Sequence, residues 1–284
     1  MGKEINLKEK VMNVIPNIDT IKSRMKDAWN AGDYGKFATY MEPGAQEILK
    51  GWCISQGRSL LDVACGTGQI SILASMAGIN VTGVDIASNS IAVARWRAVR
   101  GGLDAKFDEG DAECLQYPDG SFDIVATLVG AMFAPQPEKV AREFIRVCKP
   151  GGRMLMVNWT PEGFVGQMFK TLVKYVPPPS GVPSPLLWGN EEVVKERFGY
   201  SVSHMILTKK IYPLWDYPFD VPEVVQFFFD NYGPMNKAIN ALDEAGGESL
   251  RKDLERVFSE FNIAKNGRTT LYGEYLEVDA FKKQ

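Results

Sequence analysis

Two glycines in the sequence sit where a ligand-binding turn is expected. Gly66 and Gly68 follow a short apolar run, Ser59 to Val63, within the segment LLDVACGTGQ. Glycine is favoured where the backbone takes a positive φ and where a ligand presses against it. The free N–H groups at the start of the next helix point toward such a ligand. The segment therefore predicts a strand, a ligand-binding turn and a helix.

Three aspartates strengthen this prediction, because each lies at or near the end of an expected strand: Asp62, Asp85 and Asp111. Open α/β sheets bind ligands at the carboxyl ends of their strands, and Asp85 has the spacing of roughly 20 residues expected for a ribose-binding carboxylate. A dinucleotide-binding motif needs a third glycine, where this chain has Ser71. An added carboxylate would also repel a pyrophosphate. The pattern favours a ligand that carries a cationic amine and a ribose but no phosphate.

Side-chain chemistry gives each aspartate an expected role toward such a ligand. Asp62 pairs with an ammonium group, Asp85 accepts both ribose hydroxyls, and Asp111 accepts from an adenine amino group. S-adenosylmethionine has all three features. The chemistry therefore predicts this molecule as the ligand.

The segment from about Arg58 to Trp159 resembles the class I S-adenosylmethionine-dependent methyltransferases. The matching blocks are LLDVACGTGQ, VTGVDIA, GDAECLQYPDGSFDIV and REFIRVCKPGGRMLMVNW, in this order. Within that family the chain is similar to the branch of small-molecule enzymes that contains quinone-biosynthesis methyltransferases. The resemblance implies S-adenosylmethionine as cofactor, S-adenosylhomocysteine as product and in-line methyl transfer, but the matching blocks say little about the acceptor.

The resemblance also implies cofactor contacts at four places along the chain. These are Asp62, Ala64, Gly66 and Gly68 in the first loop, Asp85 and Ile86 at the ribose and adenine, Asp111 and Ala112 at the adenine edge, and Thr127 and Leu128 beside the methionine part. The family often has glycine where Ala64 stands, which is a mild change. Related enzymes often fold an N-terminal helix over the cofactor, so Tyr34 and Trp29 are candidates to close the site, although simple helix packing explains them equally well.

Strands that alternate with single helices predict a doubly wound α/β fold. The expected strands are Ser59 to Val63, Val81 to Val84, Ala105 to Glu109, Phe122 to Ala126 and Met154 to Val157. The resemblance implies a seven-stranded, mostly parallel, Rossmann-like sheet whose last strand is antiparallel. The alternating run Tyr272 to Phe281 fits that strand.

The remaining segments predict additions around this sheet rather than a second core. We expect residues 1–57 to form N-terminal helices that cover the cofactor site, and residues 58–284 to form the methyltransferase domain. Cap insertions are expected at about 160–200 and 216–265. The expected helices there are Phe164 to Val173, Val224 to Phe229, Met235 to Leu242 and Leu250 to Phe261, and the expected strand between them is Ser201 to Leu214.

The cap segments are rich in aromatic residues. Part of these must line the cavity between cap and sheet, since ligand pockets are mostly apolar, although helical aromatic faces are usually core. The expected pocket residues are Phe133, Trp159, Phe164 and Trp188. The hypothesis is a small, apolar or aromatic methyl acceptor.

No catalytic constellation is expected, because a sulfonium is already an activated methyl donor, and the catalytic residues stay unknown. His204, the single histidine, is a candidate general base, but a structural or surface role is the alternative. The four cysteines match no zinc pattern, so we expect no metal.

Composition limits the other functions. The net charge of −3 gives no support to a nucleic-acid or anionic-membrane partner. The longest apolar stretch, Ile124 to Ala134, is far below the roughly 18 residues of a membrane span, and the first residues do not read as a signal peptide. We therefore expect a cytoplasmic monomer or homodimer. The alternatives are an RNA or protein methyltransferase, a non-catalytic S-adenosylmethionine-binding protein or, more remotely, a nicotinamide dehydrogenase.

Overall fold

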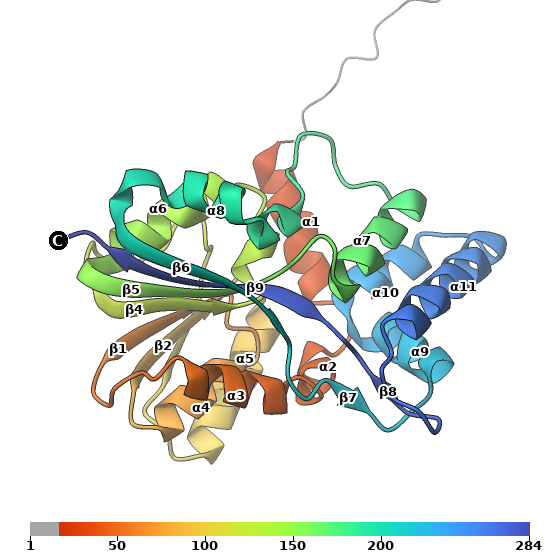
Figure 1. The fold of residues 1–284 in the computed structure, drawn as a ribbon, viewed down its shortest axis with the longest axis horizontal. Helices are drawn as coiled ribbons and strands as arrows, with labels where there is room; N and C mark the ends of the chain where they lie inside the picture. The colour runs from red at the N-terminus through yellow and green to blue at the C-terminus, as the bar shows by residue number, and fades with distance from the viewer. Residues whose placement is uncertain (1–16) are drawn as a thin grey trace, which may run out of the picture.

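The computed structural model describes residues 17–284. Residues 1–16, which include the start that we expect to be no signal peptide, lie outside the described residues. A seven-stranded sheet with the strand order β3-β2-β1-β4-β5-β9-β6 forms the centre of the molecule (Figure 1). Its strands are β1 (Ser59–Val63), β2 (Asn80–Asp85), β3 (Lys106–Glu109), β4 (Phe122–Leu128), β5 (Cys148–Trp159), β6 (Val202–Ile211) and β9 (Glu274–Lys282).

The strand directions confirm the expected Rossmann-like sheet. Strands β1 to β5 run parallel to one another, whereas β9 is antiparallel to both of its neighbours, β5 and β6. The central strands are buried on both faces, which explains why β1 reads as a continuous apolar run with all of Leu60 to Val63 buried. The expected strand at the end of the chain is therefore β9, and it lies inside the sheet.

Helices cover both faces of this sheet, as a doubly wound fold requires. Figure 1 shows α3 (Glu42–Gly51), α4 (Gln69–Met76) and α5 (Ser88–Arg100) below the sheet, and α6 (Pro137–Val147) and α8 (Glu191–Phe198) above it. The face of α6 that carries Val140, Phe144 and Val147 is buried. The strand order reverses between β1 and β4, and ligands bind at such switch points in open α/β sheets.

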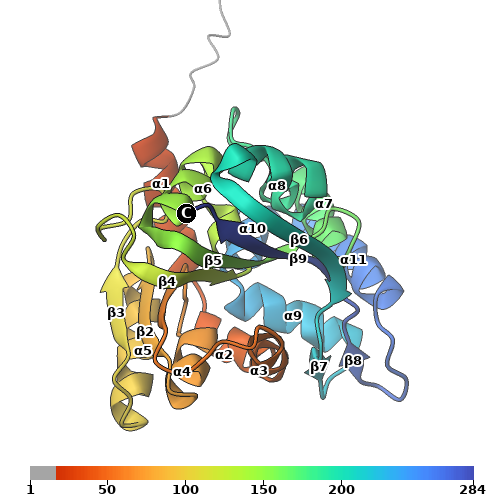
Figure 2. The same cartoon turned by 60° about the vertical axis from the view of Figure 1, so that its left-hand side comes forward.

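Four further helices form a cap at one end of the sheet (Figures 1 and 2). They are α7 (Phe164–Tyr175), α9 (Val221–Asn231), α10 (Gly233–Asn240) and α11 (Glu244–Glu260). Edge-to-face aromatic contacts connect three of them: the Phe258 ring of α11 packs against Phe164 of α7 and Phe228 of α9, at 4.7 Å and 4.9 Å between ring centroids. The segment 160–200, which we expected to be one cap insertion, contributes to two parts of the fold. Helix α7 belongs to the cap, whereas α8 packs on α6 beside the sheet.

The first described helices pack against this cap. Helix α1 (Ile18–Trp29) contacts α10, and α2 (Tyr34–Thr39) contacts α9. Helix α2 was not expected from the sequence, because it has only six residues. The Asp33 side chain accepts a hydrogen bond from the Lys36 N–H at 2.9 Å and starts this helix. Two short strands, β7 (Asp216–Tyr217) before α9 and β8 (Thr269–Thr270) after α11, pair antiparallel and so connect the two ends of the segment that forms α9, α10 and α11.

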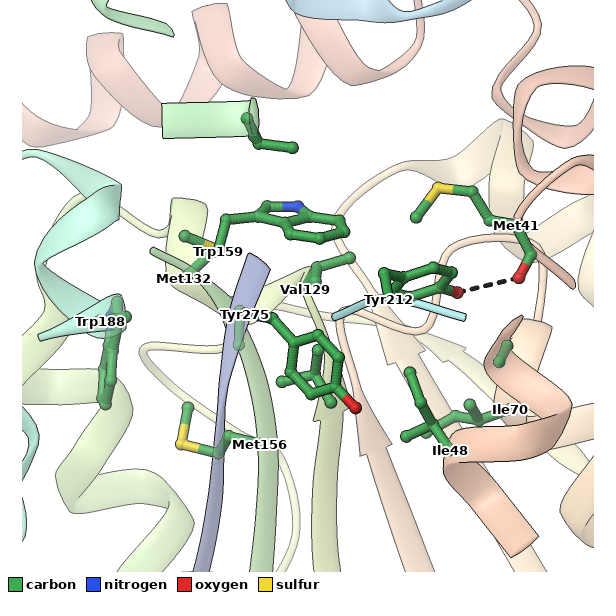
Figure 3. Close-up of a cluster of buried hydrophobic side chains, with 14 of the residues drawn as sticks. Met41, Ile48, Ile70, Val129, Met132, Met156, Trp159, Trp188, Tyr212 and Tyr275 are labelled. Carbon is green, nitrogen blue, oxygen red and sulfur yellow. Dashed lines mark hydrogen bonds between the residues drawn. The ribbon is translucent and has the colours of Figure 1, made fainter. Parts of the chain in front are cut away.

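The buried core joins these parts into one body. Figure 3 shows side chains from α3, from the sheet and from the segment after β6 packed together. The Tyr212 hydroxyl donates to the Met41 carbonyl at 2.9 Å, which fixes the chain after β6 to the start of α3 (Figure 3). At Gly44 a Cβ would lie 2.3 Å from the Pro213 carbonyl oxygen, so only glycine fits this contact.

Candidate active site

One cavity lies at the carboxyl edge of the central strands, between the sheet, α1, α2 and the cap. Its empty volume is about 1050 Å³, counted together with the space at its mouth that is open to solvent. The loops after β1, β2 and β3 contribute polar groups to one half of its wall. The other half is aromatic and comes from α1, α2, the segments after β4 and β6, the end of β5 and the cap. The cavity therefore has two chemically different halves, a carboxylate half and an aromatic half.

The turn after β1 has the left-handed backbone that its glycines predict. The φ angles are 56° at both Ala64 and Gly66 and 84° at Gly68. Gly66 lines the cavity, and a Cβ there would lie 3.2 Å from the Tyr34 ring. Gly68 does not line the cavity, because it begins α4 and faces Ile72 and Phe107 instead. Only the first of the two glycines is thus placed to admit a ligand.

The Asp85 carboxylate joins this turn to the end of β2. Its Oδ2 accepts from the Gly66 N–H and its Oδ1 accepts from the Ala87 N–H, both at 2.8 Å. Burial raises the pKa of Asp85, and the backbone donors oppose that rise. Asp85 lines the cavity together with Ile86. The structure therefore holds one carboxylate in a fixed position between the first two loops.

Asp111 lies after β3 and is joined to α1. Its Oδ1 accepts from the Glu113 N–H at 2.8 Å, and its Oδ2 pairs with Lys22 Nζ at 2.6 Å. Lys22 also reaches Glu113 Oε2 at 2.5 Å. Burial lowers the pKa of Lys22, but its bonds to these two carboxylates raise it more, so Lys22 stays charged. Asp111, Ala112 and Lys22 line the cavity, and Lys22 was missed because helical spacing gives no sign of its distant partners.

Asp62, which we expected to pair with a ligand ammonium, does not line the cavity. Its side chain is buried, and its Oδ2 accepts from the Ser71 hydroxyl at 2.6 Å. Burial raises the pKa of Asp62 to about 7. The carboxylate instead connects the end of β1 to the first turn of α4, and this bond stabilises the intervening turn on the side away from the cavity.

Thr127 and Leu128 also fall behind the cavity wall. The Thr127 hydroxyl accepts from the Ala131 N–H at 3.0 Å and is fully buried. The wall at this point consists of Val129, Gly130 and Ala131. Gly130 packs directly on the first loop, because a Cβ there would lie 2.4 Å from the Ala64 carbonyl oxygen. Thr127 therefore shapes the wall without being part of it.

Aromatic rings make up most of the second half of the cavity. Trp159 stacks on Trp215 at 5.3 Å, and Phe133 packs on Trp29 at 5.2 Å between centroids. The whole set of aromatic lining residues in this half is Trp29, Phe37, Phe133, Trp159, Trp215, Phe228 and Tyr232. The aromatic half lies beside Tyr34, whose ring contacts Trp29 at 5.9 Å.

Three expected site residues lie elsewhere. Phe164 is buried between α7 and α11 and does not line the cavity. Trp188 lies under the Arg197 guanidinium, 4.4 Å from its ring centroid, away from the cavity. His204 is exposed on the outer strand β6, next to Phe281. The structure therefore does not bring Phe164, Trp188 or His204 to this cavity, because sequence order does not reveal which face of an element is turned to it.

Within residues 17–284, no group of three or more His, Cys, Asp and Glu side chains is arranged to hold a metal ion. In the same part of the chain, no helix combines the length and the apolar character that crossing a membrane requires.

The carboxylate half fits a cationic nucleoside better than a dinucleotide. Asp85, Asp111 and Gly66 line the cavity, and at Gly66 there is no room for a side chain, since a Cβ would lie 3.2 Å from the Tyr34 ring. Lys22 is the sole cationic side chain of the lining among the described residues, and two carboxylates already neutralise it. A pyrophosphate would therefore find no free positive charge here.

Comparisons with known proteins agree with this geometry. The family model described as "Methyltransferase domain" matches residues 61–156. The chain is 32% identical to an uncharacterized protein of Mycobacterium tuberculosis over 93% of this chain and 96% of the relative. It is 42% identical to a ubiquinone/menaquinone biosynthesis C-methyltransferase of Rhodopseudomonas palustris, over 36% of this chain and 42% of that enzyme.

A solved structure shows the same fold. Phosphoethanolamine N-methyltransferase 2 of Haemonchus contortus, solved in complex with S-adenosyl-L-methionine, superposes with a TM-score of 0.55 at 19% identity. The match covers 84% of this chain and 52% of that chain.

Proposed function

We propose a reaction on the premise that this chain belongs to the class I S-adenosylmethionine-dependent methyltransferases and uses S-adenosylmethionine as methyl donor. The proposed reaction moves the methyl group to a small, apolar or aromatic acceptor held in the aromatic half of the cavity. The observation that carries this proposal is the single cavity that joins the carboxylate half to the aromatic half.

The carboxylate half would hold the cofactor. We assign Asp85 to the ribose hydroxyls, Ile86 to the face of the adenine, and Asp111 with Ala112 to the adenine edge. Ala64 and Gly66 would border the methionine part, since their loop lines the wall next to Gly130. Tyr34 would close this half, because its ring lies over Gly66.

The chain's own contribution is alignment in a dry site. When bound, S-adenosylmethionine supplies a methyl group already activated by a sulfonium. The rings of α1, the cap and β5 line the space beside it, and with both ligands bound they would limit the access of water. Alignment of two reactants contributes on the order of 7–11 kcal/mol to lowering a bimolecular barrier. Among the described residues, the aromatic half holds no His, Cys, Asp or Glu, so no general base is assigned.

The aromatic half is what favours a small molecule over RNA or a protein. Its walls are aromatic and come from buried residues such as Trp159 at the end of β5 and Phe228 of the cap, which are 3% and 1% exposed. The chain carries a net charge of −3, which offers no general attraction for a polyanion. A relative named for quinone biosynthesis supports an aromatic acceptor.

An acceptor screen tests this proposal. The protein and S-adenosylmethionine are incubated separately with naphthalene-1,4-diol, 1-naphthol, hexylamine, transfer RNA and a mixed peptide pool. S-adenosylhomocysteine release and the mass of each product are measured. We expect methylation of the oxygenated aromatic compounds, and no product from the Asp85→Ala variant. Methylation of transfer RNA or peptides alone would overturn the proposal.

A further inference from the structure

Tyr232 occupies a fixed place in the aromatic half, where α9 ends and α10 begins. Its side chain is held by three rings, Phe37 at 4.9 Å, Trp29 at 5.8 Å and Phe228 at 6.0 Å between centroids. The residue is only 6% exposed. Contacts from α1, α2 and α9 therefore fix the direction of the ring and of its hydroxyl.

The Tyr232 hydroxyl has no hydrogen-bond partner among residues 17–284, whereas the buried Tyr212 and Tyr217 each have one. The Tyr212 hydroxyl donates to the Met41 carbonyl, and the Tyr217 hydroxyl accepts from Trp215 Nε1, both at 2.9 Å. Polar atoms that are sealed and unpaired occur at Trp52 and Trp188, but the Tyr232 hydroxyl is not one of them. Because Tyr232 lines the cavity, we conclude that its hydroxyl opens on it.

The charges around the cavity limit what this hydroxyl meets. The ionised side chains of the lining are Lys22, Asp85 and Asp111, and all three belong to the carboxylate half. A buried ammonium or phosphate on the acceptor would thus lack a counter-charge beside Tyr232. Burial raises the pKa of Tyr232, and nearby Tyr34 adds to this rise, so the hydroxyl keeps its proton and is available as a donor.

We propose that Tyr232 determines acceptor specificity by donating a hydrogen bond to an oxygen of the acceptor, which makes the acceptor an uncharged, oxygenated aromatic compound of the phenol, quinol or enol class. This inference rests on the proposed function and refines its acceptor. The surrounding rings would bind the aromatic body, whereas Tyr232 would distinguish an oxygenated ring from a plain hydrocarbon. A buried site whose polar group is left unpaired discriminates against the ligand that lacks the matching group.

A pair of probes that differ by one hydroxyl tests this role without turnover. The dissociation constants of 1-naphthol and naphthalene are measured on the protein saturated with S-adenosylhomocysteine, for the unchanged chain and for Tyr232→Phe. We expect the unchanged chain to bind 1-naphthol about tenfold more tightly than naphthalene, the size of one well-placed hydrogen bond. Tyr232→Phe should weaken 1-naphthol alone and bring the two constants together.

Tyr275→Phe is the matched control. Tyr275 is a buried tyrosine, 3% exposed, with no hydrogen bond to the described residues, and it does not line the cavity. This variant should keep the tenfold preference, and both variants should bind S-adenosylhomocysteine as the unchanged chain does. That shared constant shows that the cavity is still formed in Tyr232→Phe.

Three results would overturn the inference. These are a tenfold preference that persists in Tyr232→Phe, an equal weakening of both probes in that variant, and a preference that is lost only in Tyr34→Phe. The acceptor screen tests the proposed reaction independently of this inference. If no aromatic compound is methylated while Tyr232→Phe still loses the preference for 1-naphthol, the proposed reaction is wrong but the binding role of Tyr232 stands.

Discussion

The two halves of the cavity are built in different ways. In the carboxylate half, short hydrogen bonds to the backbone fix Asp85 between two loops, and these residues lie close together in the sequence. In the aromatic half, Trp29, Phe133 and Phe228 come from distant segments and are held by ring packing. The comparison indicates that the cofactor region is specified by local motifs, whereas the acceptor region depends on how the cap and α1 assemble. Variants in one half should therefore leave the ligand of the other half unaffected.

The largest expected effect is on cofactor binding by Asp85→Ala. Hydrogen bonds to a charged group contribute about 1.5–3 kcal/mol each, so loss of two ribose contacts should weaken the binding of S-adenosylhomocysteine by about 100- to 10,000-fold. Isothermal titration measures this constant. Asp123→Ala is the control, because its carboxylate bonds the Ser59 N–H at the opposite edge of the sheet. Unchanged binding in Asp85→Ala would contradict the assignment of this half.

A smaller effect on the same ligand is expected from Gly66→Ala. The new Cβ would lie 3.1 Å from Gln69 Oε1 and 3.2 Å from the Tyr34 ring, which lines the cavity, and the alanine would have to keep a left-handed φ of 56°. We expect S-adenosylhomocysteine to bind about tenfold more weakly, a change of about 1.4 kcal/mol. Gly102→Ala imposes a similar backbone cost at φ 62° with nothing within 4 Å, so it should lower stability and leave binding intact. Equal binding constants for these two variants would show that Gly66 does not border the ligand.

Phe133→Ala should affect the other half. This ring packs on Trp29 at 5.2 Å and on Phe169 at 5.6 Å. Its removal should weaken the binding of 1-naphthol about threefold to tenfold, because aromatic pairs contribute about 0.5–1.5 kcal/mol. S-adenosylhomocysteine should bind as before. Phe261→Ala, which removes a ring outside the cavity, is the control. A loss of S-adenosylhomocysteine affinity in Phe133→Ala would contradict the view that the two halves bind their ligands independently.

Asp62→Asn should change the pH dependence of stability. The raised pKa of about 7 means that the folded chain keeps a proton that the unfolded chain releases near pH 4. The free energy of unfolding should therefore fall as the pH rises from about 4 to 7, and then stay level. Asp62→Asn should lack this fall, which is worth on the order of 1–4 kcal/mol. Urea unfolding across pH 4–8 measures it, and parallel curves for the two proteins would rule out the assigned pKa.

A smaller effect is expected from Ser71→Ala, measured in the same series of urea unfolding experiments across pH 4–8. The Ser71 hydroxyl lowers the pKa of Asp62 by donating to it at 2.6 Å. Without this donor the pKa should rise further, and the fall in stability should extend to higher pH. The unfolding midpoint in urea is the measurement. A fall that ends at lower pH than in the unchanged chain would contradict the geometry.

His204→Ala should leave turnover of any acceptor that the screen identifies within about twofold, because the side chain is exposed on β6 and outside the cavity. A steady-state rate measurement decides this. A large loss of rate would restore His204 as a general base.

Much of the fold follows from the sequence, because its signals are local. The alternation of strands and helices and the turn at Gly66 depend on neighbouring residues, and the antiparallel β9 follows from the family resemblance. The role of Asp62 could not be predicted, since a strand-end aspartate reads the same whether it faces a ligand or Ser71. The role of Lys22 could not be predicted either, because its partner Asp111 is 89 positions away in the sequence.

The central claim is that one cavity holds a cationic nucleoside on carboxylates and an acceptor among aromatic rings. A crystal structure of the chain with S-adenosylhomocysteine and 1-naphthol tests it most directly. We expect the ribose on the Asp85 carboxylate, and the naphthol ring beside Trp159 with its oxygen within hydrogen-bond distance of Tyr232. A nucleoside bound in the aromatic half, or a naphthol bound outside the cavity, would contradict the claim.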